Sequence, residues 1–444
     1  MKNKLLITIF FILSAVMTVG CSESSDYEFV FTEYENGIEL YRFVPHKDEF
    51  DTVIIPDEYE GKSVTKIEDN AFACSCSIKT IVLPSNLEII GDNSFATKNR
   101  ISLEKIPDTI SYVGEIRFMD KDMNRFDILK NNSSYSVVDG AVLSEDGHCL
   151  LAYDSNLSNE EYVVPDGVTI ISKNAFFGCK YLKKVVLPDT IEVLEENAFE
   201  SCSNLEEINF PNSLKFMDTT SLYSTKWFDE QRGEVIINDK FYLKSELTDD
   251  TMTIPNGITH FLCDFGDFEQ SPSIIKIPDS LEYISPNATI FATSFYVSVG
   301  NKNFVTDEDF LLSKDRTKLI RSTVRGDYSV TIPDTVSEIC TNAFRYTMFN
   351  NIIIPNSVTT IDEGAFYDAE VVKIDIPDSV TKLNKNTFYG CYMLEELYIP
   401  NSVKNIHPLI KDDMIMFDDV DIKVEKGSFA QKYCELFDIE YDLV

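Results

Sequence analysis

Apolar residues recur along the chain at a fixed interval of 22 or 23 positions. The segment 168–190 carries one set of them: Ile171, Phe176, Leu182, Val185 and Leu187. The segment 191–213 follows without a gap and repeats their spacing: Leu194, Phe199, Leu205, Ile208 and Phe210. The last two apolar positions of each set are two residues apart, which is the spacing of a β-strand with one face buried. We therefore expect one short strand in each repeat.

A proline and a polar residue follow each expected strand. Proline lacks the amide donor that would continue a β-ladder, and an Asp or Asn after it favours a turn. The Asn-Ala-Phe stretch at 174–176 is too short for an independent helix, so we expect a tight or single helical turn that places Phe176 in the core. Twelve of the 16 prolines have this setting, mostly 22 or 23 residues apart, with three long gaps. Such a period is typical of a solenoid, whose rungs are stable only when stacked.

The repeated order of Ile, Asn-Ala-Phe, Leu, Ile and Leu-Pro-Asp/Asn-Ser/Thr resembles the BspA-type leucine-rich repeat of bacterial surface proteins. The resemblance extends over about ten units from Thr52 to Ser402. The last residues, 426–444, resemble the closing segment of such arrays, and we expect a short helix at 428–436 that caps the last rung. The resemblance implies adhesion to host proteins or to other bacteria.

The predicted fold is a leucine-rich-repeat solenoid made mostly of short parallel β-strands with tight or short helical turns. Residues 52–425 form the array, residues 21–51 a tether and N-terminal cap, and residues 426–444 a C-terminal cap. The long gaps near 111–160, 214–250 and 285–330 contain alternating apolar and polar residues around turn signals, which predicts inserted β-hairpins. We expect these insertions to be surface excursions, often on the binding side of a solenoid.

The first 20 residues predict an export signal. Lys2 and Lys4 precede the apolar run 5–20, which is short for a membrane span. Residues 18–21, Thr-Val-Gly-Cys, resemble a bacterial lipobox in which Cys21 is lipidated after cleavage, although Thr18 stands where leucine is usual. No other segment approaches 18 consecutive apolar residues. The mature chain is therefore expected outside the cell, held at the cell membrane by its lipid alone.

The net charge of −35 argues against nucleic acid or an anionic membrane surface as the main partner. Motifs for catalysis are also missing from the sequence: it holds no H-E-x-x-H, no G-x-S-x-G and no glycine-rich phosphate loop. The four histidines fall at unrelated positions of the repeat. We predict that the protein is not an enzyme and has no catalytic residue, metal or cofactor.

The cysteines suggest packing more than chemistry. Cys179, Cys202 and Cys391 share one position of the repeat, where other copies carry small residues, so we expect free thiols there. A bond between Cys179 and Cys202 on adjacent rungs is the open alternative. Cys74 and Cys76 lack the second ligand pair of a zinc site. One acidic cluster lacks the glycine and the spacing of a calcium loop and is expected to be solvated: Asp412, Asp413, Asp418, Asp419 and Asp421.

Stacked rungs align the outward side chains of the expected strands into one broad face, which repeat proteins use for binding. This candidate binding face comprises Thr80, Val82, Lys184, Val186, Glu207, Asn209, Lys373, Asp375, Glu396 and Tyr398. Tyr398 and the aromatic residues of the insertions are candidate anchors, with Trp227 more expected to cover the core: Tyr296, Phe304, Phe310 and Trp227.

We predict a surface-anchored adhesin whose partner is an extracellular protein or glycan. An envelope-bound structural role without a host partner is the alternative. An enzyme within an insertion is the third possibility.

Overall fold

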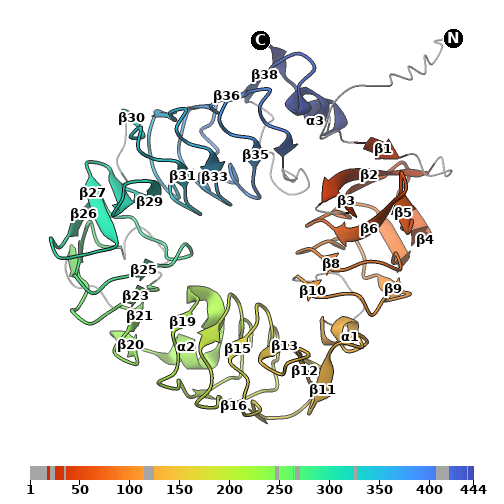
Figure 1. The fold of residues 1–444 in the computed structure, drawn as a ribbon, viewed down its shortest axis with the longest axis horizontal. Helices are drawn as coiled ribbons and strands as arrows, with labels where there is room; N and C mark the ends of the chain where they lie inside the picture. The colour runs from red at the N-terminus through yellow and green to blue at the C-terminus, as the bar shows by residue number, and fades with distance from the viewer. Residues whose placement is uncertain are drawn as a thin grey trace.

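The computed structural model describes residues 18–20, 26–34, 37–114, 125–245, 250–263, 265, 271–324, 328–406, 420–437 and 439–444. Over these residues the chain winds as a solenoid of short strands that bends into a ring (Figure 1). Most neighbouring strands pair in parallel, and consecutive rungs are offset by about one repeat, as in the pairing of Ile170 with Val193. The predicted solenoid is confirmed.

Each rung contributes two strands to the ring. In the rung 168–190, β15 (Ile170–Ile171) lies toward the centre and β16 (Lys184–Val186), just before the proline, lies on the rim (Figure 1). Equivalent strands stack into an inner and an outer sheet within each part of the ring. The outer strands are those that the sequence predicts, and the inner strands are an addition to that prediction.

The turn between the two strands is set by its asparagine. Asn174 and Asn197 have φ of 60° and 56°, a left-handed conformation that asparagine tolerates better than most residues. Gly364 takes this place in a later rung with φ of 59°. The turn delivers a phenylalanine into the core, where Phe176 stacks on Phe199 with ring centroids 4.8 Å apart. The expected tight turn is confirmed.

The described residues form four hydrophobic clusters, which divide the ring into four blocks: block 1 (26–129), block 2 (136–230), block 3 (235–297) and block 4 (304–444). Every block begins with antiparallel strands and continues with parallel rungs. Block 1 contains β2 (Tyr27–Tyr34), β3 (Gly37–Pro45), inner β6 (Lys62–Ile67), β8 (Ile89–Ile90) and β10 (Tyr112–Val113), outer β4 (Glu49–Ile54), β7 (Ser77–Val82) and β9 (Ser102–Glu104), and the short β5 (Glu58–Tyr59) and α1 (Arg125–Leu129). Block 2 contains β11 (Ser136–Val138), β12 (Ala141–Leu143), β13 (Cys149–Tyr153), inner β15, β17 (Val193–Leu194) and β19 (Phe216–Met217), outer β14 (Glu161–Val163), β16 and β18 (Glu207–Ile208), the 3-10 turn η1 (Thr219–Leu222) and α2 (Lys226–Glu230).

Blocks 3 and 4 follow the same plan. Block 3 contains β20 (Val235–Ile237), β21 (Phe241–Lys244), inner β23 (His260–Phe261) and β25 (Tyr283–Ile284), and outer β22 (Thr251–Thr253), β24 (Ile274–Ile277) and β26 (Ser294–Val297). Block 4 contains β27 (Phe304–Asp307), β28 (Phe310–Ser313), β29 (Lys318–Ser322), inner β31 (Glu338–Ile339), β33 (Thr360–Ile361), β35 (Lys382–Leu383) and β37 (Asn405–Ile406), outer β30 (Ser329–Thr331), β32 (Asn351–Ile353), β34 (Lys373–Asp375), β36 (Glu396–Ile399), β38 (Asp421–Val424) and β39 (Asp442–Leu443), and α3 (Phe429–Phe437). Helix α3 lies where the capping helix is expected, with Ala430 and Tyr433 in the block 4 cluster.

The predicted hairpins are present, but they are not surface excursions. In each of them the last antiparallel strand pairs in parallel with the first inner strand that follows: β13 with β15, β21 with β23 and β29 with β31. The expectation of excursions is wrong because these strands are apolar on both faces. A strand of this kind has to be covered on both sides.

Each hairpin forms a wall between two cores. Val142 of β12 belongs to the block 1 cluster, whereas its neighbours Ala141 and Leu143 belong to the block 2 cluster. Successive side chains of a strand point to opposite faces, so one strand serves both blocks. The strands β21 and β28 follow the same alternation, with Tyr242 and Leu311 in the block 3 cluster.

The first hairpin closes the ring by the same alternation of side chains between two cores. Phe29 and Phe31 of β2 belong to the block 1 cluster, but Val30 between them belongs to the block 4 cluster. Tyr41 of β3 also packs into block 4, and its hydroxyl donates a hydrogen bond to the carbonyl of Ile406. The first block thus covers the open end of the last one.

The predicted signal peptide and Cys21 lie outside the described residues, apart from 18–20. These three residues form β1 (Thr18–Gly20), which pairs antiparallel with β2. Cleavage before Cys21 and its lipidation stay predictions.

A charged triad is buried in block 1. Lys66 donates hydrogen bonds to Glu39 and Glu68 over 3.0 and 2.7 Å, and Thr32 donates to Glu39 over 2.6 Å. Burial raises the pKa of Glu39 from 4.5 to about 7, and the hydrogen bond and charge of Glu68 add to this effect. One lysine faces two carboxyl groups here, so Glu39 holds a proton more readily in the folded state than in the unfolded state.

This difference predicts a pH-dependent stability. The stabilisation that Glu39 contributes is fully present below about pH 4.5 and is lost as the pH rises through about 7. The substitution Glu39→Gln removes this titration, so the unfolding free energy of the variant, relative to the wild type, should rise between pH 5 and pH 8. Urea unfolding at both pH values measures the difference, with the exposed Glu58→Gln as control. If the unfolding free energies of the Glu39→Gln variant and the wild type differ by the same amount at both pH values, Glu39 titrates normally.

Candidate functional site

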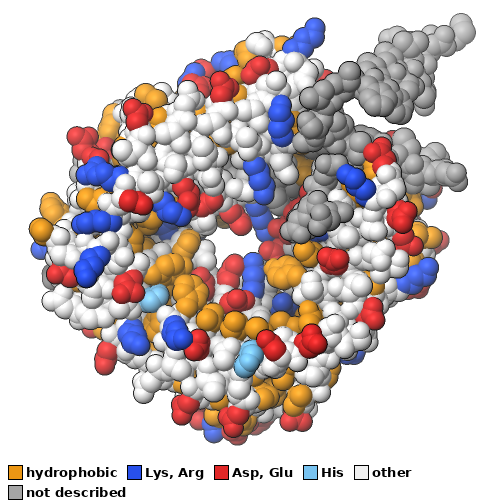
Figure 2. Space-filling model, viewed as in Figure 1, with side chains coloured by type: hydrophobic (Ala, Val, Ile, Leu, Met, Phe, Trp, Pro, Cys, Tyr) orange, Lys and Arg blue, Asp and Glu red, His pale blue; other side chains and the backbone are white. Residues whose placement is uncertain are grey.

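The inner turns of all four blocks converge on a polar pocket at the centre of the ring. Its volume is about 550 Å³. Figure 2 shows a hollow at this centre, with acidic, basic and hydrophobic side chains around it. The lining residues of this central pocket are Asp92, Asn93, Lys173, Asn174, Glu196, Asn197, Asp218, Pro286, Asn287, Thr341, Asn342, Arg345, Glu363, Gly364, Tyr367, Lys385 and Asn386.

The lining follows one structural rule. The first pocket residue of each rung comes one or two residues after an inner strand, as Lys173 follows β15 and Lys385 follows β35. The turn asparagine comes next. Its left-handed backbone turns the chain away from the centre toward the buried phenylalanine, so the polar pair is left at the inner surface.

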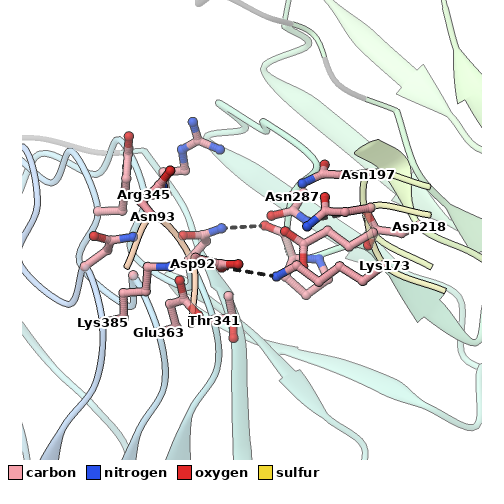
Figure 3. Close-up of a pocket in the computed structure, with 17 residues that line it drawn as sticks. Asp92, Asn93, Lys173, Asn197, Asp218, Asn287, Thr341, Arg345, Glu363 and Lys385 are labelled. Carbon is pink, nitrogen blue, oxygen red and sulfur yellow. Dashed lines mark hydrogen bonds and ion pairs between the residues drawn. The ribbon is translucent and has the colours of Figure 1, made fainter. Parts of the chain in front are cut away.

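Two lysines are held in the pocket by carboxylates, and each pairs with at least one carboxylate of another block. The Lys385 ammonium of block 4 lies 2.9 Å from Asp69 and 3.2 Å from Asp92, both of block 1. The Lys173 ammonium of block 2 lies 3.5 Å from the same Asp92 and 3.0 Å from Glu196 (Figure 3). Asp92 therefore lies between two cations and links three parts of the ring.

The protonation of these groups follows from their partners. Burial would lower the pKa of Lys385, but Asp69 and Asp92 raise it above the ordinary value, so the amine stays charged. Burial raises the pKa of Glu363, and Lys385 and Lys173 only partly oppose it. Both lysines of the pocket are thus paired with carboxylates already in place.

Asparagine amides form much of the remaining wall. Asn342 donates a hydrogen bond to the Pro286 carbonyl over 3.0 Å, and Asn287 lies 3.5 Å from Asp218. Asn174 is 4% exposed, and both its side-chain Nδ2 and Oδ1 are buried with no hydrogen-bond partner within the described part of the chain. Oδ1 of Asn93 is also buried without a hydrogen-bond partner among the described residues. An unpaired buried amide is costly, so these atoms mark unused binding capacity.

One side of the pocket is aromatic. The Arg345 guanidinium lies over the rings of Tyr346 and Tyr367, 4.7 and 4.9 Å from their centroids. Tyr367 in turn stacks on Tyr389 with 4.9 Å between ring centroids. These stacked groups are fixed against each other, and Arg345 and Tyr367 of this stack line the pocket.

The predicted binding face lies on the outer strands, and the structure spreads it over three blocks. Thr80 lies in block 1, Lys184 in block 2 and Lys373 in block 4, so the ten residues line the rim without meeting at one place. Much of this face consists of ion pairs between rungs. Lys184 lies 3.1 Å from Glu161, and Lys373 lies 3.2 Å from Glu396.

Some residues predicted for this face are otherwise engaged. Val82 is only 7% exposed, because it lies between Ile54 and Glu104, its partners on the two neighbouring strands. Its assignment to an exposed face is wrong. Asn209 bonds the backbone N–H and carbonyl of Leu187 through its amide, over 2.7 and 2.8 Å, and so holds two rungs together.

The predicted aromatic anchors divide into two kinds. Tyr296 on β26 is 57% exposed and remains available. Phe304 and Phe310 are buried, so their assignment as anchors is wrong: they are the core-facing residues of the hairpin wall between blocks 3 and 4. Trp227 packs on Phe210 with centroids 5.2 Å apart and covers the block 2 core, as expected.

Apolar residues that the sequence analysis missed stand at outward positions of the outer strands. Ile54 on β4, Val163 on β14 and Ile353 on β32 are 59%, 60% and 47% exposed. Each is flanked by a buried residue of the same strand, so alternation along the strand was the available signal.

The cysteines follow the packing prediction in part. Cys179, Cys202 and Cys391 are free and buried, and the Cys202 thiol lies 3.0 Å from the Phe176 carbonyl. Burial raises the pKa of the Cys179 thiol well above its usual value, which makes it unreactive. Cys74 and Cys76 form a disulfide, which the sequence analysis did not predict.

The described residues contain one group with metal-ligand character. Glu338, Cys340 and Asp362 place their ligand atoms within 4.8 Å of one another. Lys318 already pairs with Glu338 over 2.8 Å, and burial raises the Cys340 pKa to about 12, so its thiol is protonated. The sequence analysis missed this group because its members lie on adjacent rungs. The predicted acidic cluster lies outside the described residues except for Asp421, which pairs with Lys423 over 3.0 Å.

A solenoid of parallel strands with one phenylalanine turn and one proline-ended strand in each rung is a leucine-rich-repeat protein. Residues 47–137, 152–261 and 328–412, more than half of the chain, match the BspA type leucine rich repeat region. The chain belongs to this family. Solenoids of this kind are typical binding scaffolds.

Several solved structures of bacterial proteins are similar to this chain in part. A leucine-rich repeat protein from Eubacterium ventriosum has 22% sequence identity and a TM-score of 0.36 over 66% of this chain and 79% of that chain. The pneumococcal vaccine antigen PcpA has 16% identity and a TM-score of 0.32 over 94% and 85% of the two chains. A leucine-rich repeat protein from Bacteroides ovatus has 19% identity and a TM-score of 0.27 over 95% and 99%.

None of the curated proteins matches the chain. Within the described residues, no helix has the length and apolar character needed to cross a membrane.

The two lysine pairings lead to a stability prediction. The substitution Lys385→Ala leaves Asp69 and Asp92 without their shared cation at a mostly buried junction, so the unfolding free energy should fall by about 2 to 5 kcal/mol. The matched control is Lys79→Ala, because Lys79 pairs with Asp51 over 2.6 Å at a fully solvated position and its loss should change little. Urea unfolding compares the variants. Equal effects of the two substitutions would show that the ring junction is not held by Lys385.

Proposed function

We propose that the protein is a lipid-anchored surface protein that adheres to an extracellular macromolecule through its outer strands. The observation that carries this proposal is the set of large apolar side chains exposed on those strands: Ile54, Val163, Tyr296 and Ile353. They recur at the same outward position of strands in all four blocks.

The surroundings of these side chains suit an interface. An apolar residue within a polar rim is a common arrangement at protein interfaces, and tyrosine is among the residues that most often dominate binding. Between the apolar positions the outer strands carry paired charges, such as Lys373 with Glu396 and Lys423 with the same Glu396. Paired charges of this kind add specificity to an interface.

The placement outside the cell rests on the sequence. The apolar run 5–20 followed by Cys21 supports export and lipidation. The family match supports a surface protein. The charge of −35 favours a neutral or basic partner over nucleic acid.

An envelope glycan is the second candidate partner. It is favoured by exposed tyrosine rings, since flat aromatic faces pack against the apolar faces of sugars. Tyr296 on β26 and Tyr181 beside the block 2 rungs are exposed at 57% and 43%. This candidate gives the chain a structural role in the cell's own wall.

Binding of the full-length chain to matrix proteins, mucins and purified wall polymers tests the proposal. At physiological salt we expect saturable binding that Val163→Asp or Ile353→Asp weakens about tenfold or more, because each introduces a charge at an apolar contact. The control is Val299→Asp, the same change at an exposed residue outside the strands. Binding to wall polymer alone would favour the envelope role. Binding that physiological salt abolishes, or that all three variants weaken equally, would exclude both.

A further inference from the structure

We propose that the central pocket binds a neutral, hydroxyl-rich small molecule, a mono- or disaccharide or the end of a glycan chain. This site is distinct from the outer strands and does not depend on the adhesive function proposed above.

The composition of the pocket excludes other ligand classes. Its wall is almost entirely polar, with Pro286 and Tyr367 as the main apolar contributions, so a lipid or hydrophobic metabolite has little to bury. Lys173 and Lys385 are held by Asp92 and neighbouring carboxylates. With Arg345 the lining holds three cations against four carboxylates, Asp92, Glu196, Asp218 and Glu363, so an anion would meet an excess of negative groups and a cation would meet three positive ones.

The other side chains of the pocket wall are suited to binding hydroxyl groups. An amide offers two donors and a carbonyl acceptor, and a carboxylate accepts at two oxygens, so neighbouring Asn and Glu side chains match the paired donors and acceptors of a sugar. Six asparagines and two glutamates, Glu196 and Glu363, contribute to the lining. The Tyr367 side chain, fixed between Arg345 and Tyr389, adds a rigid group to this lining.

The fold leaves the amide of Asn174 without a hydrogen-bond partner among the residues that the structure describes. Its side chain is 96% buried at the wall, since only 4% is exposed, and neither Nδ2 nor Oδ1 has a partner. Asn93, across the block junction, leaves Oδ1 unpaired. Both residues line the central pocket, so a hydroxyl-rich ligand there would lie beside amides that the fold leaves without partners.

The size of the pocket fits this class of ligand. Its volume of about 550 Å³ lies within the roughly 300 to 1,000 Å³ of small-molecule sites. The pocket is open at the hollow of the ring (Figure 2), so a ligand can enter along the ring axis. The inner turns on all sides would then contact it at once.

Calorimetry with the full-length chain tests the proposal, using glucose, galactose, N-acetylglucosamine and their disaccharides as probes. We expect saturable binding of at least one neutral sugar with one site per chain. The substitution Asn174→Gly should weaken it about tenfold or more by removing the amide. Glycine accepts the φ of 60° at this position, so the turn is preserved. Asn93→Gly provides a second variant with φ of 51° and the same expected direction.

Asn70→Gly is the matched control. Asn70 is buried and has φ of 56° in the first rung, but it does not contribute to the pocket wall. The sugar affinity of the Asn70→Gly variant should stay within about twofold of the wild type. Thermal melts should show that all three variants are folded. Competition by wall polymer or mucin fragments separates a chain end from a free sugar, and sensitivity to Asn174→Gly with either source supports the site. No neutral sugar bound at millimolar concentration, binding of inorganic phosphate alone, or equal loss in Asn70→Gly and Asn174→Gly would overturn it.

Discussion

The structure depends on β-strands that are apolar on both faces. Val142, Tyr242, Leu311 and Val30 each pack into a different core from their immediate neighbours, because alternate side chains of one strand point to opposite faces. A strand of this kind joins two blocks and closes the open end of the rungs before it. An ordinary solenoid needs polar capping units at its two ends. Here the first hairpin packs on the last block, so the chain covers its own end and forms a ring.

Ring closure explains the central pocket. The inner turns of a straight solenoid would form a polar ridge open to solvent, and Lys173, Asp92 and Lys385 would be far apart. Closure brings them within ion-pair distance, and the buried Asn174 belongs to the wall of the same pocket. The pocket and the outer strands are therefore separate surfaces with different chemistry: paired charges and amides inside, and apolar residues among ion-pair ladders outside.

The sequence predicts each rung well, because a rung is a local pattern. The Asn-Ala-Phe turn, the proline-ended strand, the free thiols of Cys179 and Cys202 and the three hairpins all depend on residues within one repeat of each other. Curvature is a small rotation summed over many rungs, and no single repeat encodes it. For this reason the pocket could not be predicted, although the polar pair before each Ala-Phe was visible. Phe304 and Phe310 were misassigned because the sequence of a strand buried on both faces is the same as that of an exposed hairpin rich in aromatic residues.

Zero-length cross-linking tests ring closure most directly. A carbodiimide joins an amine to a carboxylate only when the two are in contact. The Lys385 ammonium lies 2.9 Å from Asp69 and 3.2 Å from Asp92, although about 300 residues separate them in the sequence. The closed ring predicts a cross-linked peptide between Lys385 and one of these aspartates in the monomer, absent from Lys385→Arg. The pair Lys183 and Glu160, 2.8 Å apart within block 2, serves as internal control. Cross-linking of that pair without any Lys385 product would contradict the ring.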